Sequence, residues 1–200
     1  LAAAGALVLC AVLQSVSGAM TLAKMLPEIE RVMALVETPF AEFPVQGLAV
    51  VGGLLGYPMF YGVMLLAVLA IDILVSGSEQ PRLLAKFTAV SFYTQVPWCI
   101  VMIAIAWYWT PEPMRVPVGA SETEILEAAA RYQRSIQSEP LMSTGRLLGH
   151  FSSLWLSAML AIALKVVGSL SVRATVAVGT VLFVICMAGP IFNFVLESLR

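Results

Sequence analysis

Long stretches without a charged side chain alternate along this chain with short charged intervals. The longest stretch runs from Phe43 to Ile71. The hydrocarbon core of a bilayer is about 30 Å thick, so a helix needs about 20 apolar residues to cross it. Five stretches are long enough to do so. They predict membrane-spanning helices over residues 1–23, 45–75, 83–109, 147–170 and 174–196.

The predicted spans are apolar on all sides, which favours helices. Strands of a membrane β-barrel alternate apolar and polar positions instead. The composition agrees, because 60% of the residues are hydrophobic and 12% are charged, whereas a soluble domain carries about 25% charged residues. The sequence therefore predicts an all-α, polytopic integral membrane bundle. Residues 1–200 form one membrane domain with five spans and additional amphipathic interfacial helices.

Prolines and glycines within the spans predict local irregularity and close packing. Pro58, Pro97 and Pro190 each lie near the middle of a span, where proline removes a backbone hydrogen bond and kinks a helix. Gly52 and Gly56 form a GxxxG step. Because such a step lets two helix backbones approach closely, we expect these two glycines to pack against another helix.

The charged interval after the first span has a helical pattern. Apolar residues recur there at steps of three and four residues, as on one face of a helix. We expect a separate amphipathic helix near the membrane surface, ended by Pro39 and Pro44. Because Leu1 already lies within an apolar stretch, we also expect the natural N-terminus to lie upstream.

The largest extramembrane segment covers residues 110–146 and contains a second predicted helix. Ser121 followed by Glu124 is a capping-box pattern, and it predicts a helix over residues 122–137. One face of this helix carries three apolar residues: Ile125, Tyr132 and Ile136. They indicate either an interfacial helix that rests on the bundle or a docking surface for another protein.

Ionisable side chains inside a membrane are functional candidates by default. Asp72 and Lys165 each lie near the end of a predicted span. We expect them to form a structural ion pair, with a proton or ion relay as the alternative. His150 is the only histidine and is predicted to be an interfacial polar anchor, and Gln95 is predicted to hydrogen-bond across helices.

The distribution of basic residues gives the predicted topology. The two tight connections, residues 76–83 and 166–173, are flanked by Lys and Arg, and short basic connections favour the cytoplasm. We therefore expect a cytoplasmic N-terminus, with both long charged intervals on the opposite side. The cluster Trp107-Tyr108-Trp109 fits an aromatic belt at the membrane surface.

Several function classes are disfavoured by the sequence. A net charge of −1 without basic clusters gives no reason to expect a nucleic-acid partner. The spacing of Cys10, Cys99 and Cys186 fits neither a metal site nor a disulfide framework, so we interpret them as packing residues. Phosphate-loop, zinc-protease and serine-elbow motifs are missing from the sequence. We therefore predict that the protein is not an enzyme and needs no cofactor or metal.

Three short segments carry a resemblance to a known family. Residues 75–79 read VSGSE, residues 86–97 read KFTAVSFYTQVP, and residues 165–174 read KVVGSLSVRA after Leu154-Trp155. From about residue 43 onward the chain resembles the bacterial branch of the Ypt-interacting-protein (Yip) family. The acidic-Leu-Tyr-Gly-Pro motif of the eukaryotic members is missing, so the resemblance does not imply Rab binding.

The Yip resemblance implies a five-span protein of the bacterial cytoplasmic (inner) membrane without enzymatic activity. Such a protein scaffolds or escorts other machinery, so membrane lipids and other membrane-protein subunits are the expected partners. The first hypothesis is therefore an accessory subunit of a larger complex, such as an export system. The alternatives are a small transporter or channel that uses Asp72 and Lys165, and a protein that organises lipids.

Overall fold

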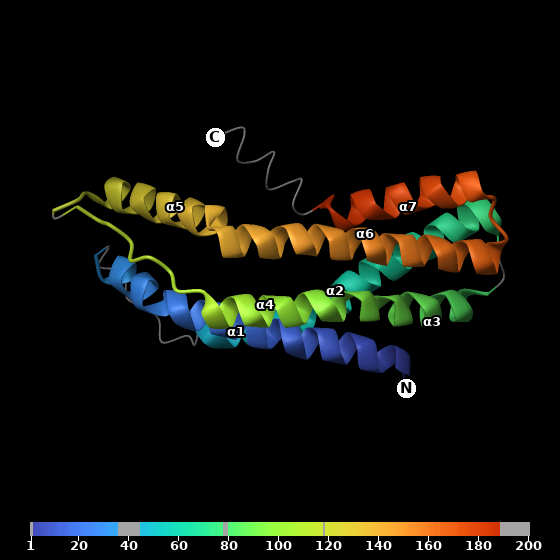
Figure 1. The fold of residues 1–200 in the computed structure, drawn as a ribbon, viewed down its shortest axis with the longest axis horizontal. Helices are drawn as coiled ribbons and strands as arrows, with labels where there is room; N and C mark the ends of the chain where they lie inside the picture. Colours follow the sequence, from blue (N-terminus) through green and yellow to red (C-terminus); the bar gives the residue numbers. More distant parts are fainter. Residues whose placement is uncertain (1, 36–44, 78–79, 118, 189–200) are drawn as a thin grey trace.

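The computed structural model of the chain is an elongated bundle of helices (Figure 1) and describes residues 2–35, 45–77, 80–117 and 119–188. No strand occurs among these residues, which confirms the predicted all-α class. The helical elements follow one another in this order: α1 (Ala2–Leu35), α2 (Val45–Ile71), the π-helical turn η1 (Asp72–Ser76), α3 (Pro81–Ser91), the 3-10 turn η2 (Phe92–Gln95), α4 (Val96–Tyr108), α5 (Glu122–Ser138), α6 (Pro140–Gly168) and α7 (Val172–Cys186).

Four of the helical segments are long and apolar enough to cross a membrane. They are Ala4–Leu35, Val50–Val75, Pro81–Tyr108 and Pro140–Gly168, and they correspond to the first four predicted spans. α7 is apolar but has only 15 residues. The last part of the predicted fifth span, residues 189–196, lies outside the described residues, so the number of five spans stays a prediction.

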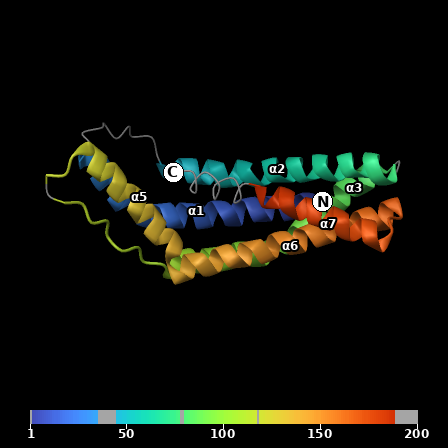
Figure 2. The ribbon, with the colours of Figure 1, turned by 90° about the horizontal axis from the view of Figure 1, so that it is seen from above.

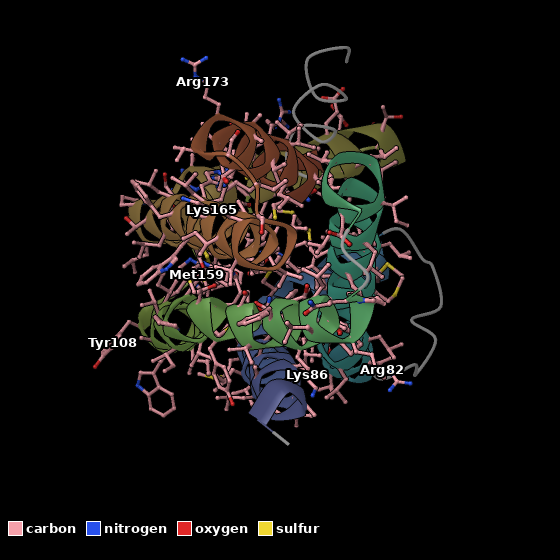
Figure 3. All side chains as sticks on the ribbon, turned by 90° about the vertical axis from the view of Figure 1, so that its right-hand side faces the viewer. Arg82, Lys86, Tyr108, Met159, Lys165 and Arg173 are labelled. Atoms are coloured by element: carbon pink, nitrogen blue, oxygen red, sulfur yellow. The ribbon has the colours of Figure 1, made fainter. Side chains whose placement is uncertain are left out.

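The relative placement of the connections follows the predicted arrangement. The N-terminus points towards the end of the bundle where α3 begins and where α6 passes into α7 (Figure 1). The C-terminal end of α1 and helix α5 lie at the opposite end. The two tight connections therefore share one end of the bundle, which we call the basic end. Arg82, Lys86, Lys165 and Arg173 surround it in Figure 3.

Helix α1 continues well beyond the first predicted span. The expected separate amphipathic helix is wrong, because α1 runs without interruption through Pro27 to Leu35. Its 34 residues are about 51 Å long, which exceeds the thickness of the hydrocarbon core. The ammonium of Lys24 donates hydrogen bonds to the backbone carbonyls of Trp107 and Trp109. These bonds hold α1 upright beside the end of α4. The expected helix breakers Pro39 and Pro44 lie outside the described residues.

The third span is irregular at the predicted proline. Pro97 has no N–H to donate to the preceding turn. The backbone tightens just before it into the 3-10 turn η2, where the Val96 N–H donates to the Tyr93 carbonyl. This confirms the predicted irregularity at Pro97. Pro58 is accommodated within α2, and Pro190 lies outside the described residues.

Helix α2 ends in a widened turn at the basic end. The N–H of Gly77 donates to the carbonyl of Asp72 at 2.6 Å, which closes η1 by a bond between residues five apart. Gly77 has a φ of 58°. Glycine adopts this left-handed conformation without the steric penalty of a side chain. It therefore lets the chain turn sharply towards α3.

The close contact between α1 and α2 is made by one glycine of α2. A Cβ atom at Gly53 would lie 2.6 Å from the Ser15 Cα, and the Ser15 hydroxyl donates to the Val50 carbonyl at 3.1 Å. A Cβ at Gly52 or Gly56 would meet no described atom within 4 Å. The predicted packing through Gly52 and Gly56 is therefore wrong within the described chain. Successive residues of a helix point about 100° apart, and Gly53 faces α1.

Helix α5 confirms the predicted helix and its cap. The Glu124 carboxylate accepts from the Ser121 N–H at 2.7 Å, and the Ser121 hydroxyl accepts from the Glu124 N–H at 3.4 Å. These hydrogen bonds from Ser121 hold the pKa of the Glu124 carboxyl below its usual value. Figure 2 shows α5 crossing the end of α1. The capping box thus starts α5 where the chain returns over the bundle.

The apolar face of α5 is covered by the chain itself. Ile125 and Ile136 are buried, and Tyr132 is half-buried. Helix α5 packs on α6 and on α1. This arrangement corresponds to the interfacial-helix interpretation. It leaves these three residues covered, so they do not form an exposed docking stripe.

Substitutions at two adjacent glycines test the contact between α1 and α2. We expect Gly53→Ala to destabilise the protein by about 1–3 kcal/mol, because the added methyl group overlaps the backbone of Ser15. Gly52→Ala is the matched control, since its methyl group meets no described atom and improves helix propensity. Thermal unfolding in detergent measures both. Equal effects of the two substitutions contradict the assignment of the contact to Gly53.

Candidate binding cavity within the bundle

Exposed aromatic and basic side chains mark two levels of the bundle. Trp107 and Tyr108 at the end of α4 are 69% and 76% exposed, as expected of an aromatic belt. Lys86 in α3 is exposed at the basic end (Figure 3). It precedes Trp107 by about 31 Å of helix, close to the thickness of the hydrocarbon core. Trp109 departs from the belt, because it is buried and its indole N–H donates to Glu139.

A cavity of about 520 Å³ lies between these two levels. Its lining comes from α1, α2, η2, α4 and α6, and from the end of α7. Cavities of about 300–1,000 Å³ are typical of sites for small ligands. The cavity therefore has the size of a binding site. It is built from segments that are far apart in the sequence.

The wall formed by α2 is rich in glycine. Gly52, Gly53 and Gly56 line the cavity together with Tyr57 and Phe60. No described atom lies within 4 Å of a Cβ built at Gly52 or Gly56. The GxxxG step predicted from the sequence thus leaves open space beside α2, because two side chains are missing there.

The opposite wall, on α6, is polar. Arg146, His150 and Ser153 line the cavity, and their spacing of four and three residues places them on one helical face. His150, predicted as an interfacial anchor, lies about 22 Å along α6 from Lys165 at the basic end. It therefore sits within the thickness of the hydrocarbon core, and Arg146 lies about one turn closer to the aromatic belt.

Two glutamines place further polar groups at mid-depth. Gln95 follows Lys86 by about 13 Å of helix, and Gln14 precedes Lys24 by about 15 Å. Lys24 is level with the aromatic belt because it is bonded to the Trp107 carbonyl. Both glutamines line the cavity. The centre of the membrane therefore contains polar side chains on two sides of the cavity.

Gln95 uses its polar group to hold two helices together. It is buried, and its amide N–H donates to the Ser152 carbonyl at 2.9 Å, which confirms the predicted hydrogen bond across helices. Trp98 makes a second link, from its indole N–H to the Gly145 carbonyl at 3.0 Å. A Cβ at Gly149 would lie 3.1 Å from the Trp98 Nε1. A glycine there gives the indole its space.

Gln14 differs from Gln95, because its side-chain oxygen is buried and finds no hydrogen-bond partner among the described residues. An unpaired buried acceptor costs about 1–3 kcal/mol. The imidazole of His150 and the hydroxyl of Ser153 also make no hydrogen bond within the described part of the chain. The cavity therefore presents polar groups whose hydrogen-bonding capacity is unused.

The cavity ends against an apolar core on the side of the basic end. The buried residues Met64 of α2, Leu156 and Leu160 of α6, and Leu182 of α7 have no exposed surface. Phe92 packs beside them, edge-to-face on three aromatic rings of α2 at centroid distances of 5.5–6.3 Å. Within the described residues, these side chains separate the cavity from the basic end.

Asp72 and Lys165 both lie near the basic end but are not brought together as predicted. Asp72 is 3% exposed and has interactions within the chain, whereas Lys165 is exposed. The ion pair found among the described residues joins Arg31 to Glu28. The predicted pairing is therefore wrong, and these two residues do not line the cavity.

Comparison of the chain with protein-family models, with curated protein sequences and with solved structures found no match. The Yip resemblance therefore stays a prediction, and the site is interpreted from its own geometry.

Three lining residues were missed as a group by sequence reasoning: Gln14, Arg146 and Ser153. Gln14 is the first side chain with an amide in an otherwise apolar stretch, which is a detectable signal. Arg146 and Ser153 share one face with His150, at helical spacing. Their common cavity was not detectable, because it depends on how α1 and α6 are placed.

The two glutamines are expected to respond differently to removal of their amides. Gln95→Leu loses a hydrogen bond across helices, so we expect a loss of about 0.6–1.7 kcal/mol. Gln14→Leu removes an acceptor without a described partner, so we expect a protein at least as stable as the parent. Thermal unfolding in detergent compares the two variants. A larger loss for Gln14→Leu than for Gln95→Leu would contradict this assignment.

Proposed function

We propose that the protein is a noncatalytic integral membrane protein that acts by binding, as an accessory or scaffold subunit of a larger membrane complex. The observation that carries the proposal is a cavity of about 520 Å³ with unused polar groups that ends against an apolar core. Such a cavity holds a ligand. It does not provide a continuous polar path across the membrane.

The Yip resemblance supports the same class of function. It implies a membrane protein without enzymatic activity that escorts other machinery, such as an export system. The partners that we propose are membrane lipids and other membrane-protein subunits. The extension of α1 and the helix α5 form an ordered extramembrane region where such a subunit has access.

A transporter or channel that uses Asp72 and Lys165 is less well supported. Lys165 is exposed, and the buried residues of α2, α6 and α7 lie between the cavity and the basic end. Conduction would require these tightly packed side chains to separate.

Flux and assembly measurements together test the proposed function. In liposomes, we expect the purified protein to pass protons and potassium no faster than protein-free liposomes do. Asp72→Asn and Lys165→Gln should leave this background unchanged, and an added ionophore serves as the positive control. After mild solubilisation of native membranes, we expect the protein to migrate as a defined complex larger than its own 21.4 kDa. Flux that Asp72→Asn abolishes, or migration as a monomer alone, would overturn the proposal.

The proposed location is the bacterial inner membrane, with the basic end in the cytoplasm. The four basic residues around that end support this orientation (Figure 3).

Reporter fusions on either side of the bundle test the orientation. We expect a cytoplasmic signal from a fusion at Gly77 and a signal from the opposite side at Gly119, because these glycines lie in connections at opposite ends of the bundle. A cytoplasmic signal at Gly119 means that the orientation is inverted.

A further inference from the structure

We propose that the cavity binds an anionic phospholipid, with the phosphate at Arg146 and His150 and the acyl chains beside the glycine-rich wall of α2. This inference deepens the proposed function, on which it rests, by naming the class of ligand. Three features of the lining lead to it: its charge, its unused hydrogen-bonding groups and its depth in the membrane.

The charge of the lining favours an anion. Arg146 is the charged member of the lining, and His150 lies one helical turn away on the same face of α6. The described lining contains no carboxylate that would neutralise them. A guanidinium carries five N–H donors. Arg146 donates to the Gln137 carbonyl, which leaves further donors for a phosphate oxygen.

The unused groups favour a ligand that also carries a hydroxyl or ester. The buried oxygen of Gln14 needs a donor, which a headgroup hydroxyl supplies. The amide N–H groups of Gln14 and the hydroxyl of Ser153 are donors for ester or phosphate oxygens. A glycerol-containing headgroup provides donors and acceptors at the same time.

The depth of the site favours a lipid over a soluble phosphate. Arg146 lies about 28 Å along α6 from Lys165, which is the level of a headgroup on the side of the aromatic belt. Gln14 lies about 15 Å deeper than Lys24, near mid-membrane. Tyr57, Phe60 and Trp98 supply apolar lining between these levels. An acyl chain gains from this apolar surface, whereas a free anion only loses hydration there.

Lipid retention in native mass spectrometry tests the proposal. The protein is released from nanodiscs that contain equal amounts of phosphatidylglycerol and phosphatidylcholine. We expect about tenfold enrichment of phosphatidylglycerol, since charge-assisted hydrogen bonds to the phosphate region favour the lipid with net negative charge. Arg146→Gln should remove most of the enrichment. Arg173→Gln, a basic residue outside the cavity, should keep it.

Filling the cavity provides an independent variant with a matched control. Gly56→Leu places a side chain in the cavity, and Gly62→Leu places the same side chain elsewhere on α2, where a Cβ also meets no described atom. We expect Gly56→Leu to lose retained lipid and Gly62→Leu to keep it. If Gly56→Leu does not fold, Arg146→Gln decides the question, because its side chain is exposed.

The outcomes separate this inference from the proposed function. Equal retention of both lipids, or undiminished retention by Gly56→Leu, would overturn the lipid site even if the complex is intact and no flux occurs. Retention of sn-glycerol 3-phosphate as strong as that of the lipid would assign the site to a soluble phosphate instead. Lipid enrichment together with Asp72-dependent flux would overturn the proposed function and leave the lipid site in place.

Discussion

The contact of Lys24 with the end of α4 is the interaction on which the arrangement of the bundle depends. The last carbonyls of a helix lack partners within the helix and carry partial negative charge. The Lys24 ammonium satisfies two of them, those of Trp107 and Trp109. This fixes the level of α1 relative to α4. It places Gln14 at mid-depth, and it holds the extension of α1 where α5 packs on it.

A difference of one residue on α2 separates packing from binding. Gly53 faces Ser15 and lets α1 and α2 approach closely, whereas its neighbours Gly52 and Gly56 face open space. Both uses depend on a missing side chain, but they affect stability in opposite ways. Close approach of two backbones increases dispersion contacts, and an unfilled space forgoes them. Keeping the space at Gly52 and Gly56 is therefore the structural cost of a cavity.

Local features of the fold could be predicted from the sequence, and long-range features could not. The lengths of the apolar stretches gave four spans, and the Ser121–Glu124 pattern gave the start of α5. These signals act within a few residues of one another. The continuity of α1 was missed because it depends on Lys24 reaching carbonyls that lie more than 80 residues away in the sequence. The pairing of Asp72 with Lys165 was wrong for a similar reason. A position near the same end of the bundle does not determine which way a side chain points.

The polar half and the apolar half of the bundle depend on each other. An unpaired acceptor such as the Gln14 oxygen is costly in a membrane, so the fold must be stabilised elsewhere. The fully buried residues beyond the cavity, among them Met64, Phe92 and Leu160, supply that stability. They also exclude water from the basic end of the described bundle. Because the same side chains stabilise the fold and close the cavity, opening a path through the bundle would sacrifice the packing that offsets the cost of its polar groups. This coupling favours a protein that holds a ligand from one side of the membrane over one that passes it across.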